Sequence, residues 1–428
     1  MAGGRPPGPR GHWLMGNIPA YEADRIGFLQ RCHREYGDVF SFDERTIFVA
    51  DPELVHEVLA DPHGGFVTEL APFSSGRDLD RAARQAGSWM SARRTVWPGL
   101  NHSAAVAADR RTVEILDATL DCAAGGEIDV VAVMLEFTGH AIAEYCVGPD
   151  STDVPELLSA SIAATEPFVG ASYRMPAWLP LRRHRRLVRL HRRTVDTLTA
   201  IVRRRRASGA PAPPGDLLAF LLDADPAMPD RTVMATLRTI LMGGHGVPAA
   251  ALASVVRELA RRPGLVADLR DEADGSTGGD GSAPAARLPL AEAVVREVLR
   301  LYPPAWLMTR VARGAGSVGR WSLRPGDEVL LNAYLIHRDP RWWPRPETFD
   351  PGRWLTGQPA AGRVYLPFGA GPRVCLGAAL AMRQLTLATS RMAQRFAVES
   401  PNAASAAPLF SGRLAPAGLR ARFLPRRG

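Results

Sequence analysis

The chain has 428 residues, of which 46% are hydrophobic and 22% charged, and its formal net charge at pH 7 is +8. This apolar content over this length is enough for a large buried core and excludes an intrinsically disordered protein. The four cysteines, Cys32, Cys122, Cys146 and Cys375, have no CxxC or paired spacing, so neither a disulfide framework nor a structural zinc site is expected. This cysteine usage is typical of a reducing compartment, and we expect a cytoplasmic protein.

The N-terminus is rich in Gly, Pro and Arg and has no apolar run of about 18 residues, so no membrane span is predicted there. Residues 1–13 are expected to be flexible. Alternation around a turn predicts a hairpin over residues 39–42 and 46–50, and residues 328–333 are expected to form a strand. Apolar periodicity predicts helices over residues 109–120, 128–146, 182–206, 216–222, 230–262, 290–301 and 376–396. The Gly/Ser/Asp-rich stretch 274–286 is expected to be a disordered surface loop. These patterns indicate one mainly α-helical (α+β) domain over residues 1–428.

The most informative segment is Phe368-Gly369-Ala-Gly371-Pro-Arg373-Val-Cys375-Leu-Gly377, just before the last predicted helix. A thiolate at a helix N-terminus is stabilised by the helix dipole and by free backbone amides. The glycines leave room for a flat macrocycle, and Arg373 can meet an anionic group on it. The pattern favours haem iron as the metal that the Cys375 thiolate binds.

Other segments at the expected spacing resemble the cytochrome P-450 family over nearly the whole chain. Glu297-Val-Leu-Arg300 resembles the ExxR motif of that family, and the segment from Pro346 to Trp354, which contains Arg353, resembles the one that supplies a second arginine. The resemblance implies a buried ionic triad of Glu297, Arg300 and Arg353, a haem b cofactor, and the fold of the family. Trp89 and Arg93 match the WxxxR helix, and Arg310 matches a further partner of the haem propionates.

The predicted helix 230–262 departs from the family, which usually carries an acid and an alcohol where this chain has Gly243-Gly244-His245-Gly246-Val247-Pro248. Gly246 stands at the acid position, and Val247 and Pro248 stand at the alcohol positions. None of these three can relay the protons that cleavage of dioxygen requires. Pro248 frees the carbonyl of Gly244 and predicts a kink. A proton could therefore pass through water at Gly244, through a substrate hydroxyl, or through His245.

This departure leaves several reactions open. We expect a monooxygenase that acts on a hydrophobic secondary-metabolite intermediate, such as a terpenoid, a polyketide or a carrier-tethered acyl or aminoacyl group. Peroxide-driven oxygenation, and a rearrangement, coupling or dehydration that never activates dioxygen, would also tolerate this helix. A haem-binding recruitment protein without turnover is the alternative from another class.

Electrons are expected from separate proteins, because no GxGxxG motif of a dinucleotide-binding unit is present. The family resemblance implies a ferredoxin, with its reductase, docking near Arg94, Arg373 and Arg383. The arginine-rich run 182–206 has the pattern of an amphipathic helix and lacks interleaved aromatic residues, which argues against nucleic-acid binding. The run is either a solvated helix face or a docking site for an acidic acyl or peptidyl carrier protein.

Residues of the substrate pocket are placed by analogy with the family. They are mainly apolar, as small-molecule pockets are. The candidates are Phe73, Phe168, Met175, Trp178, Met242, Gly243, Val247, Ala305, Trp306, Leu307 and Phe410.

Overall fold

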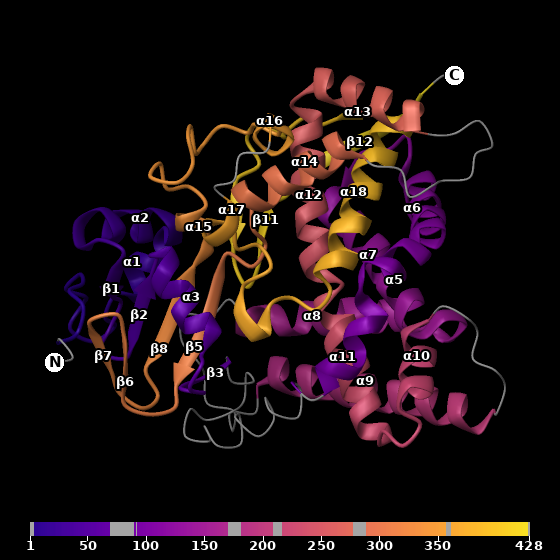
Figure 1. Ribbon diagram of the computed structural model, residues 1–428. Coiled ribbons are helices and arrows are strands. Elements are labelled where there is room, and N and C mark those ends of the chain that lie inside the picture. The colour runs from indigo at the N-terminus through magenta and orange to yellow at the C-terminus, as the bar shows by residue number, and fades with distance from the viewer. Residues whose placement is uncertain are drawn as a thin grey trace.

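The computed structural model describes residues 4–68, 90, 92–169, 181–208, 216–276, 288–356 and 361–426. The chain forms a smaller β-rich region and a larger helical region, which lie side by side in Figure 1. The order of the elements agrees with the predicted α+β class.

The β-rich region is built on a five-stranded sheet in the order β1-β2-β8-β5-β3. Its strands are β1 (Val39–Ser41), β2 (Thr46–Val49), β3 (Phe66–Thr68), β5 (Leu307–Ala312) and β8 (Glu328–Asn332). β1 and β2 pair antiparallel as the predicted hairpin, and β2 pairs parallel with β8 over residues 46–49 and 328–331. Three N-terminal helices complete this region: α1 (Ile18–Ala23), α2 (Arg25–Tyr36) and α3 (Pro52–Ala60).

The helical region contains the remaining long helices. They are α5 (His102–Ala107), α6 (Asp109–Ala123), α7 (Val130–Val147), α8 (Val154–Val169), α9 (Arg182–Ala207), α10 (Leu217–Ala224), α11 (Asp230–Gly243), α12 (Gly246–Ala260), α13 (Pro263–Ser276), α14 (Pro289–Leu301) and α18 (Ala378–Arg395). Short helical turns are η1 (Trp97–Leu100), η2 (Gly148–Asp150), α15 (Ala333–Ile336), α16 (Gly352–Leu355), α17 (Ala361–Val364) and η3 (Gly371–Arg373). The smaller strands are β4 (Ile128–Asp129), β6 (Gly316–Val318), β7 (Trp321–Leu323), β9 (Phe396–Glu399), β10 (Pro408–Phe410), β11 (Leu414–Pro416) and β12 (Arg420–Pro425).

The core of the helical region surrounds α12, which packs against α7, α14 and α18. Most side chains of α12 are buried, and they are small enough for the neighbouring helices to approach closely. Two stretches, residues 130–150 and 230–260, are long and apolar enough to cross a membrane, but 67% of each apolar window is buried inside the protein. Burial of this kind is typical of core helices.

Three expectations differ from the structure. The predicted helix over residues 230–262 is two helices, because the chain leaves the helix at Gly244 and His245 and re-enters it at Gly246. Residues 274–276 continue α13, and the rest of the expected loop lies outside the described residues. The expected flexible N-terminus is attached to the sheet region: Arg5 forms an ion pair with buried Asp327 at 2.8 Å, and the amide of Ser41 donates to the carbonyl of Pro7 at 2.8 Å.

Candidate functional site

Cys375 lies two residues before Gly377, the N-cap of α18, as the sequence predicts. Its amide donates to the Phe368 carbonyl at 2.8 Å, which closes the loop, and Gly369 and Gly371 adopt positive φ angles of 72° and 70°. At Gly371, a Cβ would lie 2.4 Å from the backbone oxygen of Leu59, so only glycine fits there. The loop is therefore held in one shape by backbone contacts.

The thiol of Cys375 is accessible, whereas Cys32 and Cys146 are buried and Cys122 is exposed on α6. Enough protein surrounds the sulfur that desolvation raises the pKa of Cys375, while the Gly377 amide and the Arg93 guanidinium lower it. Both of these groups stabilise a thiolate, and bond formation to a metal favours the same form. Among the four cysteines, Cys375 is the one placed to bind a metal.

Three arginines gather around this loop: Arg93, Arg310 and Arg373. None of them forms an ion pair within the described residues, although the negative charge of Asp61 acts on Arg310. Arg93 is buried and donates to the Val374 carbonyl, Arg310 donates to the carbonyl of Thr309 at 2.9 Å, and Arg373 lies 3.3 Å from the Thr68 hydroxyl. Burial, together with the positive charge of Arg373, lowers the pKa of Arg310 to about 10. Converging cations that repel one another fit an anionic ligand, and the two propionates of haem satisfy this requirement.

Glu297, Arg300 and Arg353 come together as the spacing predicts. Both oxygens of Glu297 accept from Arg300, at 2.8 and 2.9 Å, and one also accepts from Arg353 at 3.1 Å. All three residues are buried, and the neighbouring arginines lower the pKa of Glu297 against the effect of desolvation. An ion network of this kind fixes the segments that it joins, because removing one partner leaves a buried charge unpaired.

Sequence reasoning missed several residues that complete this network. The indole of Trp354 donates to Glu297 at 3.0 Å, and Arg300 donates to three backbone carbonyls, among them that of His337 at 2.9 Å. The His337 ring contacts the Arg300 carbonyl and accepts from the Leu366 amide at 2.8 Å. Burial lowers the pKa of His337 to about 3, so this ring is neutral at physiological pH. The position of Trp354 next to Arg353 could have indicated its place in this network. Nothing in the sequence indicates that His337 belongs to it.

The break between α11 and α12 places the five residues at the predicted proton-delivery positions in different surroundings. At Gly244, a Cβ would lie 2.6 Å from Ile142, so this glycine permits close packing on α7. Val247 is 42% exposed, whereas Gly246 and Pro248 are buried. Pro248 lies in the first turn of α12, where a helix needs no backbone donor. The proline thus follows a helix break and does not kink a continuous helix.

His245 packs against α7. Its Nε2 lies 2.9 Å from the Leu135 carbonyl, and the hydroxyl of Thr138 donates to the His245 carbonyl at 2.9 Å. Burial lowers the pKa of His245 to about 4, so the ring is neutral near pH 7. Nε2 also lies 3.4 Å from the Ser159 hydroxyl of α8. A buried ring that is hydrogen-bonded to its neighbours in this way favours a structural role for His245.

The residues expected in the substrate pocket divide into four groups. Met242, Gly243, Ala305 and Leu307 are at least partly accessible, as is Val247. Trp306 is 3% exposed and belongs to the core of the β-rich region, where its indole donates to the Ser411 carbonyl at 3.0 Å and its ring meets Phe410 edge-on. Phe168 packs between α8 and α9, with Arg183 at 5.6 Å from its ring. Phe73, Met175 and Trp178, like the cofactor candidate Trp89, lie outside the described residues.

The arginines expected to dock a ferredoxin differ in availability. Arg94 is exposed, as expected for its helical phase, and Trp97 beside it is 47% exposed. Arg383 is paired with buried Asp109 through several hydrogen bonds, so it joins α18 to α6 and is not free for a partner.

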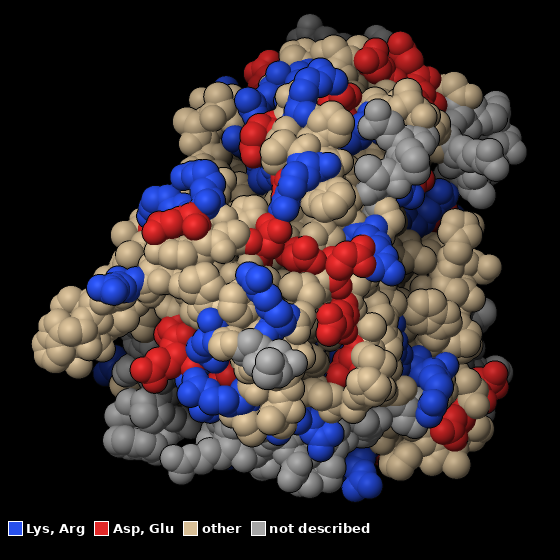
Figure 2. Space-filling model, turned by 60° about the vertical axis from the view of Figure 1, so that its left-hand side comes forward, with Lys and Arg blue, Asp and Glu red and all other residues tan. Residues whose placement is uncertain are grey.

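Charges on the surface are partly neutralised by pairing. On the face shown in Figure 2, basic and acidic side chains are interleaved. In α9, the C-terminal arginines Arg204, Arg205 and Arg206 form ion pairs with aspartates. The N-terminal arginines of α9 form no ion pair within the described part of the chain; they are Arg182, Arg183, Arg185, Arg186, Arg189, Arg192 and Arg193. These seven are called the α9 arginine patch below.

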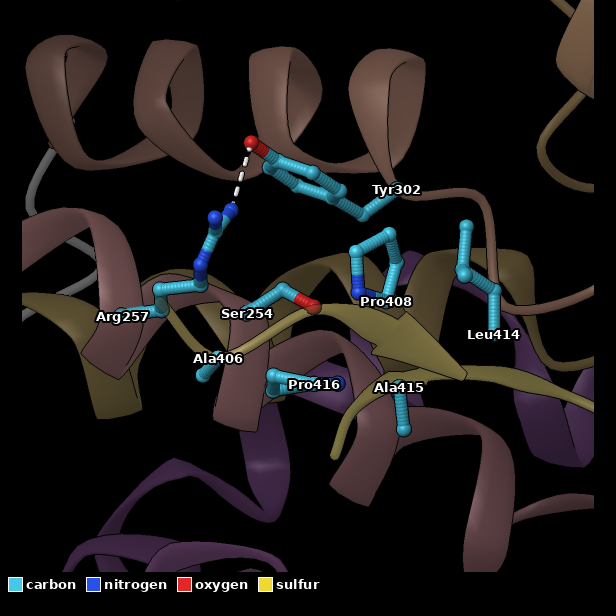
Figure 3. Close-up of a pocket in the computed structure, with 8 residues that line it drawn as sticks. All are labelled: Ser254, Arg257, Tyr302, Ala406, Pro408, Leu414, Ala415 and Pro416. Atoms are coloured by element: carbon cyan, nitrogen blue, oxygen red, sulfur yellow. Dashed lines mark hydrogen bonds between the residues drawn. The ribbon is translucent and has the colours of Figure 1, made fainter. Parts of the chain in front are cut away.

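A small pocket lies away from the Cys375 loop, between α12 and the β10–β11 hairpin (Figure 3). Ser254 and Arg257 of α12 border it, and Arg257 donates to the Tyr302 hydroxyl at 2.9 Å. Tyr302 in turn donates to fully buried Glu258 at 2.9 Å. These contacts attach the hairpin and the end of α14 to α12.

Comparison with known proteins agrees with this geometry. The family model described as Cytochrome P450 matches residues 6–414. Cyclooctatin synthase of Streptomyces melanosporofaciens is 32% identical over 81% of this chain and 79% of its own, and Cyclooctat-9-en-7-ol 5-monooxygenase of the same organism is 28% identical over 90% and 87%. The solved structure of the cytochrome P450DA heme domain shares the fold, with a TM-score of 0.82 at 22% identity over 99% of this chain and 98% of that one. The chain therefore belongs to the cytochrome P450 family of haem-thiolate monooxygenases, and it is an oxidoreductase whose family binds haem iron through an axial cysteine.

Proposed function

We propose that this protein oxygenates a hydrophobic small molecule that carries few polar groups, with dioxygen as oxidant and separate proteins as electron donors. The main support is the similarity to Cyclooctat-9-en-7-ol 5-monooxygenase over 90% of this chain, since that name describes a hydrocarbon skeleton with one hydroxyl group. Apolar Met242, Val247 and Leu307 are accessible, which agrees with such a substrate. The class matches the expected terpenoid type of secondary metabolite.

Within this proposal, Cys375 is the axial ligand, and Arg93, Arg310 and Arg373 hold the propionates. When bound, haem supplies the chemistry that inserts one oxygen atom of dioxygen into a C–H or C=C bond of the substrate. The protein's own contribution is to keep the Cys375 loop rigid through Gly371 and to leave an apolar surface at Val247 for the substrate.

The test is incubation with ferredoxin, ferredoxin reductase, NADPH and a panel of polycyclic hydrocarbon alcohols under ¹⁸O₂. The proposal predicts a low-spin to high-spin shift of ferric haem on substrate binding and a product that carries one ¹⁸O atom. Product with hydrogen peroxide but none with ferredoxin, reductase and NADPH would indicate the peroxide-driven alternative. An isomer without ¹⁸O would indicate rearrangement. If no member of the panel gives a product or a spin shift, that result would favour a recruitment role.

The α9 arginine patch supports a second proposal, concerning partners. Positive charge near a helix N-terminus is opposed by the helix dipole, at a cost of about 0.3–1 kcal/mol for each nearby residue. An acidic surface, such as that of a carrier protein bearing a tethered acyl or aminoacyl group, would offset this cost.

Charge reversal at Arg182, Arg183, Arg185 and Arg186 should reduce turnover of a carrier-tethered substrate at least tenfold and leave the free acid unchanged. Reversal of Arg320, which is exposed between β6 and β7, is the matched control. Equal losses with tethered and free substrates would contradict docking. The cytoplasmic location and the ferredoxin site near Arg94 stay predictions.

A further inference from the structure

Gly246, in the first turn of α12, stands at the position where the family carries an acid. A side chain from another part of the chain occupies the space beside this glycine. A Cβ built on Gly246 would lie 2.6 Å from Nη1 of Arg413, so the guanidinium takes the space into which a side chain at 246 would extend. Ile162 of α8 also approaches this position, at 3.4 Å. An aspartate or glutamate here would collide with Arg413, or would pair with it after a small shift.

Arg413 forms an ion pair with the carboxylate of Glu166. Its Nη2 lies 2.7 Å from Oε2 of Glu166, near the end of α8, and the Ser411 hydroxyl lies 3.0 Å from Oε1 of the same carboxylate. The Glu166 side chain is 34% exposed and that of Arg413 is 18% exposed. An acid and an alcohol thus lie within hydrogen-bond distance of each other, one guanidinium away from the position where the family carries its acid.

The segment that supplies Ser411 and Arg413 is firmly placed. The Ser411 carbonyl accepts from the Trp306 indole at 3.0 Å, and the Leu414 amide donates to the Pro304 carbonyl at 3.0 Å. Leu414, Ala415 and Pro416 border the pocket beside α12 that Figure 3 shows. This turn, which joins β10 to β11, is therefore attached both to the β-rich region and to α12.

We propose that Glu166 and Ser411 form a relocated acid-alcohol pair that exchanges protons between solvent and the substrate at the exposed Val247 side of α12, and that Arg413 is its positioning residue. This inference rests on the proposed monooxygenase function. It accounts for the glycine at 246, because Arg413 occupies the space beside Gly246 and pairs there with the carboxylate of Glu166 from α8.

The transfer of one proton from solvent through Glu166 and Ser411 leaves both residues in their starting forms. Solvent protonates a carboxylate oxygen of Glu166, which is accessible enough to be reached. The Ser411 hydroxyl then passes its proton to a hydroxyl or water of the bound substrate complex and takes the proton of Glu166, so that the carboxylate and the hydroxyl return to their starting forms. No electron moves in this exchange.

His245 is a poorer candidate for this exchange. Its ring faces α7, where Nε2 is bound to the Leu135 carbonyl, and burial lowers its pKa to about 4. Among the described residues near Gly246, Glu166 is the carboxylate that combines solvent access with a hydroxyl partner.

The test compares Glu166→Gln with Glu156→Gln, which removes an exposed acid in the first turn of the same helix. With ferredoxin, reductase and NADPH, Glu166→Gln should lower product formation about a hundredfold or more, and most consumed NADPH should appear as hydrogen peroxide. With hydrogen peroxide as oxidant, which brings its own protons, product formation by the same variant should match the wild type. Ser411→Ala should behave like Glu166→Gln, and Glu156→Gln should behave like the wild type.

A binding measurement gives a readout that does not depend on turnover. Ferric protein binds cyanide from hydrogen cyanide, which must lose its proton, so Glu166→Gln should slow cyanide association about tenfold or more, whereas Glu156→Gln should not. Adding Gly246→Asp to Glu166→Gln restores a carboxylate beside Arg413 from the helix side, and this double variant should recover most of the lost rate.

Two results would overturn the inference. If Glu166→Gln makes product and peroxide in the wild-type ratio, the pair carries no protons. If Glu166→Gln loses activity equally with dioxygen and with hydrogen peroxide, the cluster only supports the fold. A wild-type protein that makes no oxygenated product under any condition would instead contradict the proposed function.

Discussion

The two sides of the haem-binding region differ in how closely they follow the family. On the Cys375 side, a backbone hydrogen bond closes the loop, and Glu297 pairs with Arg300 and Arg353 as their spacing predicts. On the side of α12, the helix is broken, the acid and the alcohol are missing, and a charged cluster from two other segments lies against Gly246. The comparison shows that the residues around Cys375 and the residues around Gly246 belong to separate parts of the molecule, so that one set can depart from the family pattern while the other keeps it.

The largest effect is expected from the sulfur itself. Cys375→Ser should abolish the thiolate-type spectrum of the reduced carbonyl adduct, because serine does not supply a soft anionic ligand. Absorption spectroscopy after reduction in the presence of carbon monoxide measures this loss. Cys122→Ser, which changes an exposed cysteine on α6, is the control and should leave the spectrum intact. An unaltered spectrum in Cys375→Ser would show that another residue binds the iron.

The buried network behind the loop should give the next largest effect. Glu297→Ala leaves Arg300 and Arg353 buried without their carboxylate, and such losses cost about 3–5 kcal/mol of folding free energy. Urea denaturation measures the change. Glu292→Ala in the same helix breaks an exposed ion pair with Arg296 and should cost at most about 1 kcal/mol. Equal effects of the two substitutions would show that the Glu297 network does not fix the fold.

A smaller effect is expected on the pH dependence of the folding free energy when His245 is replaced. Its pKa is about 4 in the folded protein and about 6.5 in the unfolded chain, so between these values the unfolded chain alone binds the proton. Stability therefore falls as the pH drops below 6.5. His245→Gln removes this dependence and should lose about 2 kcal/mol less folding free energy than the wild type between pH 7 and pH 5.

Denaturation at both pH values measures this difference, with His63→Gln on the surface as the control. A variant with the same pH dependence as the wild type would mean that His245 is charged in the folded protein.

The smallest effect concerns the arginines that surround the loop. Arg310→Met removes one of the three arginines proposed to hold the propionates. A charge-assisted hydrogen bond to a propionate is then lost, so haem should leave the variant about tenfold faster. Transfer of haem to excess apomyoglobin measures the rate. Arg94→Met, at an exposed position, is the control. Unchanged haem loss in Arg310→Met would place the propionates elsewhere.

Sequence reasoning predicted the features that depend on short spacings. The Cys375 loop, the Glu297–Arg300 pair and the β1–β2 hairpin each lie within a few residues, so local geometry determines them. It did not predict the Glu166–Arg413 pair, whose members are separated by 247 residues. Pro248 did indicate an interruption, but the bounds of α11 and α12 show that the break lies at Gly244 and His245, before the proline.

The misassigned residues have a common physical cause. Trp306 was expected in the substrate pocket and lies in the core, since apolar composition does not distinguish a pocket wall from a packed interior. Arg383 was expected to bind a partner, but Asp109, distant in sequence, neutralises it. In both cases the deciding contact is long-range, and a single sequence does not contain it.

The most direct test of the account is the absorption spectrum of the purified wild-type protein after reduction with dithionite and addition of carbon monoxide. Cys375 bound to haem iron as a thiolate predicts a strongly red-displaced Soret band. A colourless protein, or a band at the position given by histidine ligation, would contradict the account.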